Sequence, residues 1–283
     1  MARLALIYDA LVRPDTTGIW CDRALRLLGH EVHHYAPLAS DGRGGLVFLG
    51  YQTLPSDYEL YLQIDDDLSY PGPVAFHPNA YWCIDTHRLD QMVGGWSRRR
   101  KAEGFDRLFT AQLDGVDVLG GSWLPLACDP SIHRPLPEVV HEFDWCFVGS
   151  TEFALRRELL TRLMARFPRH FVGRAYGEDL VSIFNRSRLI LNISVGKDVN
   201  MRCFEAQACG GLLLTNRVDN GEDQLFSHLV TYATAEELEE VFSYFLGHDA
   251  ERTALAARQC EETRRRHSYQ QRMSELLAAC GVT

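Results

Sequence analysis

The sequence predicts an α/β protein of two successive domains. Apolar segments of strand length alternate with segments of helical periodicity along the whole chain, which is typical of parallel sheets that carry helices on their faces. The segment 129–142 is rich in proline and glutamate and separates two such alternating runs, so it is the best candidate for an interdomain linker. A chain of 283 residues is long enough for two domains of ordinary size.

The first half begins with the apolar run RLALIYD at residues 3–9, which predicts a buried parallel strand. A helix over residues 19–28, ended by Gly29, and an alternating strand over residues 31–35 complete a β-loop-α-β unit. The unit lacks the G-x-G-x-x-G fingerprint of a dinucleotide site, which argues against an NAD-dependent enzyme. Further strands are expected at residues 46–49, 59–64, 74–77, 80–84 and 108–111.

The second half repeats this alternation from residue 143 onward. Leu155, Leu159, Leu163 and Phe167 recur at every fourth position and predict a helix that ends near Arg166. The remaining strands are expected at 145–148, 170–172, 189–193, 212–215 and 229–232, and the remaining helices at 177–186, 201–209, 235–246 and 269–280, with a long polar helical stretch reaching residue 266.

The composition is that of an ordinary globular protein, with 46% apolar and 24% charged residues. A formal net charge of −9 argues against a general binder of nucleic acids or anionic membranes. No run approaches the roughly 20 apolar residues that a membrane span requires. The eight cysteines are scattered without a C-x-x-C pair, so we expect buried free thiols in a protein of the reducing cytoplasm.

The most informative stretch is 190–222, where a strand, a polar loop, a short helix and a second strand follow one another. Asn200 is expected to cap the helix, because its side-chain oxygen can accept a hydrogen bond from a backbone N–H of the first turn. A helix that begins at the carboxyl end of a parallel strand points its positive dipole end at the ligand crevice of α/β proteins. We therefore expect Asn200, Met201 and Arg202 to lie at a phosphate. Glu205, one turn later, is placed to accept hydrogen bonds from a ribose diol.

A resemblance to the spore-coat CgeB-like glycosyltransferases rests on two segments, NMRCFEAQACGGLLLTN at 200–216 and HLVTYATAEELEEVFSYFLGHDAERTALAARQCEETRRRHSYQQRM at 228–273. The resemblance covers roughly residues 144–275 and extends more loosely to the nucleotide-sugar domain of GT-B glycosyltransferases in general. The segments YWCIDTH and WLPLACDPSIHRP look like parts of the same family's amino-terminal half.

This resemblance implies a GT-B architecture, in which two Rossmann-like domains face a central cleft and a C-terminal helix crosses back to the N-terminal domain. We accordingly expect an acceptor-side domain at 1–138, a nucleotide-sugar domain at 139–266 and the crossing helix at 267–283. The implied reaction moves a sugar from a nucleoside diphosphate sugar, with a UDP-sugar as first choice, to an acceptor. The acceptor stays open between a glycan, a protein, a small molecule and a modified nucleic acid.

The same resemblance bears on metal use and on two charged residues. Cationic side chains and the helix end neutralise the diphosphate in this family, so we expect no metal cofactor. Glu205 matches the second carboxylate of the family's E-x7-E motif, which contacts the ribose; alternatively it only stabilises its own helix. Lys197 replaces the first carboxylate and would meet a phosphate or a sugar carboxylate, or remain a solvated loop charge. The stereochemistry of transfer is left open by this replacement.

Polar residues after the first strand of the second half are further donor-binding candidates. Ser150 and Thr151 follow that strand directly and are expected near the phosphates. Arg156 and Arg157 lie a turn or more inside the next helix, and we expect both at the surface.

Three more donor-binding candidates follow later strands. Arg174 and Tyr176 come after the strand at 170–172, where a nucleotide base could stack, although Tyr176 would equally suit an ordinary half-buried aromatic. Glu222 resembles a family position near the donor, yet a turn rich in Asp, Asn and Gly exists without any function.

Asp85 and His87 are the catalytic candidates. They end a strand two residues apart, so in an extended chain both side chains face the same side. A carboxylate beside an imidazole can deprotonate an acceptor hydroxyl, with His87 as the base. In the alternative, Thr86 caps the next helix and His87 is only a first-turn residue.

Acidic and basic runs complete the candidates. Asp65-Asp66-Asp67 contains the D-x-D pattern of metal-dependent glycosyltransferases, but three acidic residues in a loop often occur by chance, so we expect no metal there. The basic runs Arg98–Lys101 and Arg264–His267 are expected to be solvated helix faces.

Other classes of function remain to be weighed against a glycosyltransferase. The missing first carboxylate at Lys197 favours a noncatalytic nucleotide- or nucleotide-sugar-binding protein on the same fold. A hydrolase is disfavoured, because the sequence has no G-x-S-x-G elbow. A DNA-associated protein is favoured by the arginine runs and disfavoured by the acidic balance.

Overall fold

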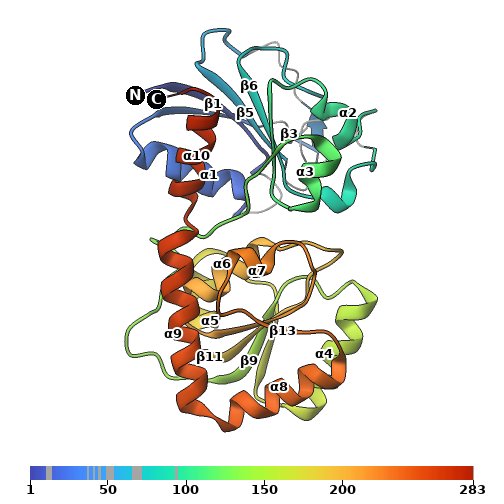
Figure 1. The fold of residues 1–283 in the computed structure, drawn as a ribbon, viewed down its shortest axis with the longest axis vertical. Helices are drawn as coiled ribbons and strands as arrows, with labels where there is room; N and C mark the ends of the chain where they lie inside the picture. The colour runs from blue at the N-terminus through green and yellow to red at the C-terminus, as the bar shows by residue number, and fades with distance from the viewer. Residues whose placement is uncertain are drawn as a thin grey trace. The chain divides into compact units, whose positions relative to one another are not determined.

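A computed structural model describes residues 1–10, 15–36, 38–40, 42–43, 46–48, 54–65, 72–92 and 95–282. The chain divides into two compact units, one of Met1–Leu126 with Tyr269–Thr283 and one of Ala127–Ser268 (Figure 1). The segment 127–138, which we expected at the end of the first domain, belongs here to the second unit. The functional limits of the domains stay a prediction.

The first unit is a six-stranded sheet in the order β2-β1-β5-β6-β7-β8, with every neighbouring pair parallel. Its strands are β1 (Arg3–Ile7), β2 (Glu31–Tyr35), β5 (Leu60–Asp65), β6 (Asn79–Cys83), β7 (Arg107–Thr110) and β8 (Ser122–Trp123), beside a separate antiparallel pair of β3 (Leu38–Ser40) and β4 (Leu46–Phe48). Its helical segments are α1 (Thr17–Leu27), the 3₁₀ turn η2 (Thr86–Arg88), α2 (Arg98–Ala102), α3 (Asp114–Leu119) and α10 (Tyr269–Ala279).

The last helix returns to the first unit, as predicted. Helix α10 packs against α1, and the buried Arg272 donates from Nε to the carbonyl oxygen of Pro125 at 2.8 Å. Helix α1 begins at a close approach to the sheet, because a Cβ atom on Gly18 would lie 2.1 Å from Cγ of Tyr8. Glycine is therefore required there by packing on the strand end.

The strand expected at 74–77 is wrong. Val74 is buried in an apolar cluster with Tyr61, but the described residues 72–78 contain no strand. Pro73 and Pro78 bracket this segment, and proline lacks the N–H that a sheet ladder requires.

The second unit is a five-stranded parallel sheet in the order β10-β9-β11-β12-β13. Its strands are β9 (Phe143–Val148), β10 (His170–Gly173), β11 (Ser187–Asn192), β12 (Leu212–Asn216) and β13 (Val230–Tyr232). Its helices are α4 (Ala154–Arg166), α5 (Gly177–Asn185), α6 (Met201–Ala208), α7 (Glu222–Leu225), α8 (Ala235–Gly247) and α9 (Asp249–Arg266). Both units are thus α/β, and the predicted fold class is confirmed.

The core of the second unit forms where α4 and α8 cover one face of this sheet. Trp145 of β9, Leu191 of β11 and Phe242 of α8 are almost fully buried in it. All eight cysteines of the protein are free, and seven of them are buried. Within the described residues, no helix is both long and apolar enough to cross a membrane.

The two basic runs are solvated only in part: Arg99, Arg100, Arg265 and Arg266 are exposed, as expected, whereas the other members are buried or half-buried. In the first unit, Arg98 and Lys101 of α2 are buried against Asp65 at the end of β5, which is itself 0% exposed. Arg98 Nε donates to Asp65 Oδ2, and Lys101 Nζ donates to Oδ1 at 3.2 Å. The expectation failed at Arg98 and Lys101, because residues three positions apart share one helix face and this face of α2 packs against the buried carboxylate of Asp65.

The second basic run holds the end of α9. Arg264 Nη1 donates to the carbonyl oxygens of His133 at 2.6 Å and Pro130 at 3.0 Å. The ring of His267 is buried between the rings of Phe204 and Phe226, at centroid distances of 5.7 and 5.2 Å. These two side chains therefore fix the segment 130–133 and the start of the return to the first unit.

Replacing Asp65 with asparagine should lower the free energy of unfolding by about 3–5 kcal/mol, because two buried cations lose their carboxylate. Urea denaturation measures the effect. The matched control is Asp90→Asn, which breaks the exposed ion pair with Arg99 at 2.9 Å and should leave the urea midpoint unchanged. Equal midpoints for the two variants would contradict the structural role of the buried cluster.

Candidate functional site

A buried polar network lies where β11 and β12 end. Asn192, the last residue of β11, donates from Nδ2 to Ser194 Oγ at 3.1 Å, to Thr215 Oγ1 at 3.0 Å and to Cys203 Sγ at 3.4 Å. The hydroxyl of Tyr232 donates to the Asn192 carbonyl oxygen at 3.2 Å. These contacts join three neighbouring strands to the first turn of α6 and fix the loop 193–200 between them.

Helix α6 begins at the predicted residue, but the predicted cap is wrong. Asn200 occupies the N-cap position, yet its side chain accepts no hydrogen bond from a backbone N–H of the first turn; its Oδ1 accepts only from the Cys203 thiol at 3.8 Å among the described residues. Its Nδ2 instead donates to Asn192 Oδ1 at 3.3 Å and to Ser194 Oγ at 3.2 Å. The amide turns toward the sheet because the buried strand end offers it two oxygens, and this leaves the start of α6 without a side-chain cap.

Arg202 and Glu205 form an ion pair on α6. Arg202 Nη1 donates to Glu205 Oε2 at 2.6 Å, and the guanidinium carbon lies 5.4 Å from the centre of the Phe184 ring. The Glu205 side chain is 0% exposed, whereas that of Arg202 is 19% exposed. The other carboxylate oxygen, Oε1, faces Nε2 of His133 at 3.5 Å. The ribose role expected for Glu205 stays a prediction.

Arg156 is a residue of this site that the sequence reasoning missed. It is half-buried rather than at the surface, and its guanidinium donates to the Ile193 carbonyl oxygen at 2.9 and 2.6 Å and to the Ser150 carbonyl oxygen at 3.0 Å. Burial and the neighbouring charge of Arg202 lower the pKa of Arg156. Among the described residues, its charge has no carboxylate within ion-pair distance. The position of Arg156 in the first turn of α4 was the only available signal, because the first turn after a parallel strand lies at the ligand-binding edge.

Glu222 organises its own loop. Its Oε1 accepts the backbone N–H groups of Val218 at 2.9 Å and Asp219 at 2.8 Å, and its Oε2 accepts that of Asn220 at 2.7 Å. The Asn220 side chain in turn donates to the carbonyl oxygen of Lys197 at 2.6 Å. Glu222 thus fixes the loop that holds the backbone of Lys197, whose side chain is exposed.

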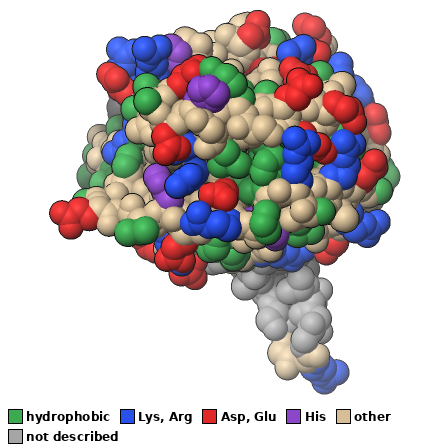
Figure 2. Space-filling model, turned by 90° about the horizontal axis from the view of Figure 1, so that it is seen from below, with side chains coloured by type: hydrophobic (Ala, Val, Ile, Leu, Met, Phe, Trp, Pro, Cys, Tyr) green, Lys and Arg blue, Asp and Glu red, His purple; other side chains and the backbone are tan. Residues whose placement is uncertain are grey.

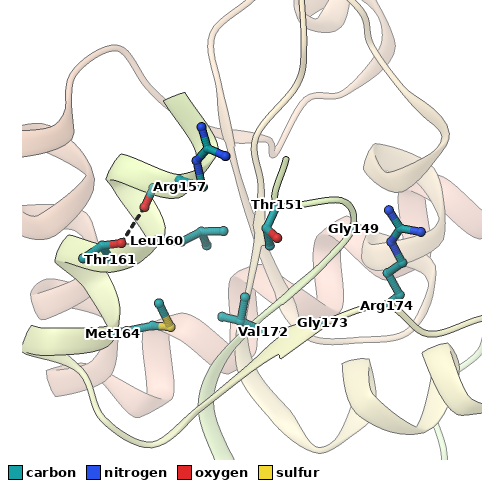
Figure 3. A pocket seen from close by; sticks show the side chains of 9 residues that line it. All are labelled: Gly149, Thr151, Arg157, Leu160, Thr161, Met164, Val172, Gly173 and Arg174. Carbon is teal, nitrogen blue, oxygen red and sulfur yellow. Dashed lines mark hydrogen bonds between the residues drawn. The ribbon is translucent and has the colours of Figure 1, made fainter. Parts of the chain in front are cut away.

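A cavity of about 400 Å³ lies between α4 and the edge strand β10 (Figure 3). Its residues on α4 include Arg157, which is exposed, and Thr161, whose hydroxyl donates to the Arg157 carbonyl oxygen at 2.7 Å. Thr151 and Arg174, both predicted from the sequence, line the opposite side. The full lining is Gly149, Thr151, Arg157, Leu160, Thr161, Met164, Val172, Gly173 and Arg174. An apolar floor with cationic and hydroxyl groups at its rim suits a small polar ligand.

The residues after β9 and β10 are brought together. Arg174 Nη2 lies 3.5 Å from Ser150 Oγ and forms an exposed ion pair with Glu152 at 3.1 Å. Tyr176 precedes α5 and is 37% exposed. Its ring is therefore available for stacking, as one of the two sequence interpretations requires.

Asp85 and His87 lie in a different geometry from the expected one. Strand β6 ends at Cys83, and Thr86–Arg88 is a 3₁₀ turn, so the argument from an extended chain is wrong. A turn nevertheless brings an Asp85 carboxylate oxygen and a His87 ring nitrogen within 4.8 Å. Thr86 does not serve as a cap, because its hydroxyl donates to Asp114 Oδ1 at 3.1 Å. The catalytic role of this pair stays a prediction.

The fold and the geometry at this sheet edge define an α/β protein with a ligand-binding edge. Two Rossmann-like units follow one another along the chain, and Arg156, Arg202 and the start of α6 lie at the carboxyl end of the second sheet, where such sheets bind ligands. A family model described as glycosyl transferase-like matches residues 134–278, slightly more than half of the chain. The chain therefore belongs to the glycosyl transferase-like family.

Solved structures agree with the GT-B fold. Sucrose-phosphate synthase from Thermosynechococcus elongatus has a TM-score of 0.67 at 10% identity, over 99% of this chain and 98% of that chain. The T4 phage β-glucosyltransferase has a TM-score of 0.63 at 11% identity, over 99% and 100% of the two chains. The Anabaena protein HepE, solved with UDP and glucose, has a TM-score of 0.63 at 10% identity over the same shares. A search of curated proteins found no match.

Glu222→Gln should destabilise the protein at pH 7 by about 1–3 kcal/mol, because an amide cannot accept all three backbone N–H groups. Burial raises the pKa of Glu222, but the backbone hydrogen bonds outweigh it and lower the pKa from 4.5. The carboxylate therefore stabilises the fold above pH 4.5, and this contribution is lost as the pH falls through the folded-state pKa.

The difference between wild type and Glu222→Gln should consequently shrink on acidification, as followed by urea unfolding from pH 7 to pH 3. Asp223→Asn, at the exposed neighbouring position, is the matched control and should track wild type. A constant difference across this range would show that the carboxylate charge does not hold the loop.

Proposed function

We propose that this protein transfers a sugar from a nucleoside diphosphate sugar, with a UDP-sugar as first choice, to an acceptor nucleophile. The observation that carries the proposal is the pair of arginines, Arg156 and Arg202, beside the start of α6 at one edge of the second sheet. Membership of the glycosyl transferase-like family supports it. So do the structural neighbours whose structures contain UDP, such as HepE and an α-glucosyltransferase.

The charge of Arg156 suits a diphosphate. Its guanidinium is half-buried and contacts backbone carbonyl oxygens, so a bound anion would supply the negative charge that the described residues do not. Arg202 and the N-terminal dipole of α6 add positive potential from the other side. Fixed positive charge at a leaving diphosphate stabilises the transition state of transfer. This arrangement needs no divalent metal, so metal independence is part of the proposal.

The remaining donor contacts follow from the same edge of the sheet. We assign the ribose diol to Glu205, which becomes available when Arg202 turns from its carboxylate to the diphosphate. The base would lie over Arg174 and Tyr176, at the mouth of the cavity beside β10. Lys197, on its fixed loop backbone, would meet a phosphate or an acid group of the sugar.

The acceptor chemistry is assigned to the first unit. His87 would remove the proton of an acceptor hydroxyl, and Asp85 would stabilise the imidazolium that forms. The acceptor stays open, since one structural neighbour was solved with a 13-mer DNA that contains a modified base and another is a sucrose-phosphate synthase. The face in Figure 2 has acidic and basic side chains interspersed rather than a field of one sign, so it gives no preference for a polyanionic acceptor. The CgeB-like subfamily and a cytoplasmic location are retained as parts of the proposal.

The proposal is tested first by nucleotide binding. One nucleoside diphosphate among UDP, GDP, ADP, dTDP and CDP should raise the melting temperature, since a ligand at a hundred times its Kd adds about 2.7 kcal/mol of stability. EDTA should not change that shift. No shift with any of them would refute the donor site.

Arg156→Met should weaken UDP binding by about tenfold or more, while uridine, which lacks phosphates, should bind as in wild type. Calorimetric titration gives both constants. Arg166→Met is the matched control, because its exposed side chain lies at the other end of α4, pairs with Glu239 and does not line the cavity, so it should leave the UDP affinity unchanged. Equal losses in both variants, or an equal loss for uridine, would remove Arg156 from the phosphate site.

His87→Asn should lower the rate at which UDP is released from UDP-glucose by about 10²–10⁴-fold, the usual range for a general base. Its UDP affinity should stay at the wild-type value, because a general base acts on the acceptor hydroxyl and not on the nucleotide. A wild-type protein that binds UDP but releases none from any UDP-sugar would instead be a noncatalytic nucleotide-sugar binder, as the replacement at Lys197 also allows.

A further inference from the structure

His133 is held in one orientation at the start of the second unit. Its side chain is 1% exposed. Its backbone N–H donates to the Asp129 carbonyl oxygen at 2.8 Å, and the Asp129 N–H donates to ring Nδ1 at 3.0 Å. Arg264 holds the His133 carbonyl oxygen at 2.6 Å. With backbone and ring both fixed, the second ring nitrogen can point in only one direction.

That nitrogen points at Glu205. Nε2 of His133 lies 3.5 Å from Glu205 Oε1. Because Nδ1 accepts the Asp129 N–H, the neutral imidazole carries its proton on Nε2. Burial lowers the pKa of His133, against the opposing charges of Glu205 and Asp129. The ring is therefore a neutral donor near pH 7, with its N–H directed at the carboxylate.

Glu205 in turn lacks a donor on that side. Its Oε2 accepts from Arg202 at 2.6 Å, but the buried Oε1 makes no hydrogen bond among the described residues. A buried carboxylate oxygen without a donor is costly. A closing movement of a few tenths of an ångström would turn the contact with His133 into a hydrogen bond.

We propose that His133 is a positioning residue for Glu205 and thereby sets the preference of the donor site for ribose over deoxyribose. It holds Oε1, so that Oε2 faces a ribose hydroxyl once Arg202 has turned to the diphosphate. The proposal rests on the proposed function, in which Glu205 contacts the ribose. The selectivity for the sugar of the nucleotide then depends on a side chain that does not touch the nucleotide.

The test compares UDP with 2′-deoxy-UDP by calorimetric titration. Wild type should bind UDP about tenfold more tightly than 2′-deoxy-UDP, the value of one hydrogen bond to a charged group. His133→Asn, whose amide is too short to reach Glu205, should bring this ratio close to one without weakening 2′-deoxy-UDP. His133→Gln, whose amide nitrogen can occupy the place of Nε2, should keep most of the ratio.

His170→Asn is the matched control. This histidine of the same unit contacts the Phe167 carbonyl oxygen through Nδ1 and packs on the ring of Trp145 at a centroid distance of 5.2 Å. Neither contact involves Glu205, so the ratio should stay unchanged. Equal ratios for the asparagine and glutamine variants at position 133 would overturn the inference. Glu205→Gln distinguishes failure of the His133 proposal from failure of the proposed function. If Glu205→Gln abolishes the ratio while both His133 variants keep it, the positioning role of His133 is refuted and the donor site stands. If wild type shows no UDP binding, the proposed function itself fails.

A measurement on wild type does not depend on whether the variants fold. Nitrogen-15 NMR of the histidine rings should show His133 as the neutral tautomer protonated at Nε2 at pH 7. Its Nε2 shift should change on addition of UDP and change less with 2′-deoxy-UDP. A ring protonated at Nδ1, or equal changes with both nucleotides, would contradict the proposal.

Discussion

The side-chain amide of Asn192 fixes the position of the loop 193–200 and the start of α6, where the candidate site of the second unit lies. Its nitrogen lies within hydrogen-bond distance of Ser194, Thr215 and Cys203 and shares two N–H donors among them, which connects a strand end, a neighbouring strand and a helix at one buried point. Each partner is itself buried, so an apolar residue at 192 would leave several polar atoms without water or partner. The start of α6 is therefore fixed by the sheet rather than by the helix's own cap. Preorganisation of this kind lowers the entropy lost when a ligand binds there.

Each unit buries a carboxylate, Asp65 in the first and Glu205 in the second. The two differ in how completely their oxygens are paired, and this difference distinguishes a structural carboxylate from a functional one. Asp65 meets a cation at each oxygen, Arg98 and Lys101, so its charge is fully compensated inside the protein. Glu205 meets one arginine and a neutral imidazole, and one of its oxygens makes no hydrogen bond among the described residues. A buried carboxylate with an oxygen that makes no hydrogen bond costs stability, so stability alone does not explain Glu205. The incomplete site is the one in the family-matched half of the chain.

The architecture was predictable because it rests on local patterns. Helix α6 lies within one residue of its predicted limits, since Gly210 and the apolar strands around it leave little choice. The site was less predictable, because the direction of a long side chain depends on neighbours in space that are distant in the sequence. Periodicity placed Arg156 on a helix but could not show that carbonyl oxygens of other segments would draw it inward. No local signal could place His133, in a proline-rich segment, beside Glu205, because their contact spans a large sequence separation.

The cysteines have a consequence for how motion in this protein can be observed. Burial raises the pKa of Cys203 to about 12, and that of Cys146 likewise to about 12, so neither thiol ionises in the folded state at neutral pH. Chemical modification of either one must wait until its surroundings open. Cys203 lies in α6 and Cys146 in the central part of the sheet. The two thiols therefore report separately on the opening of the helix and on the opening of the sheet. Their labelling rates would time the fraying of the helix separately from the opening of the whole unit.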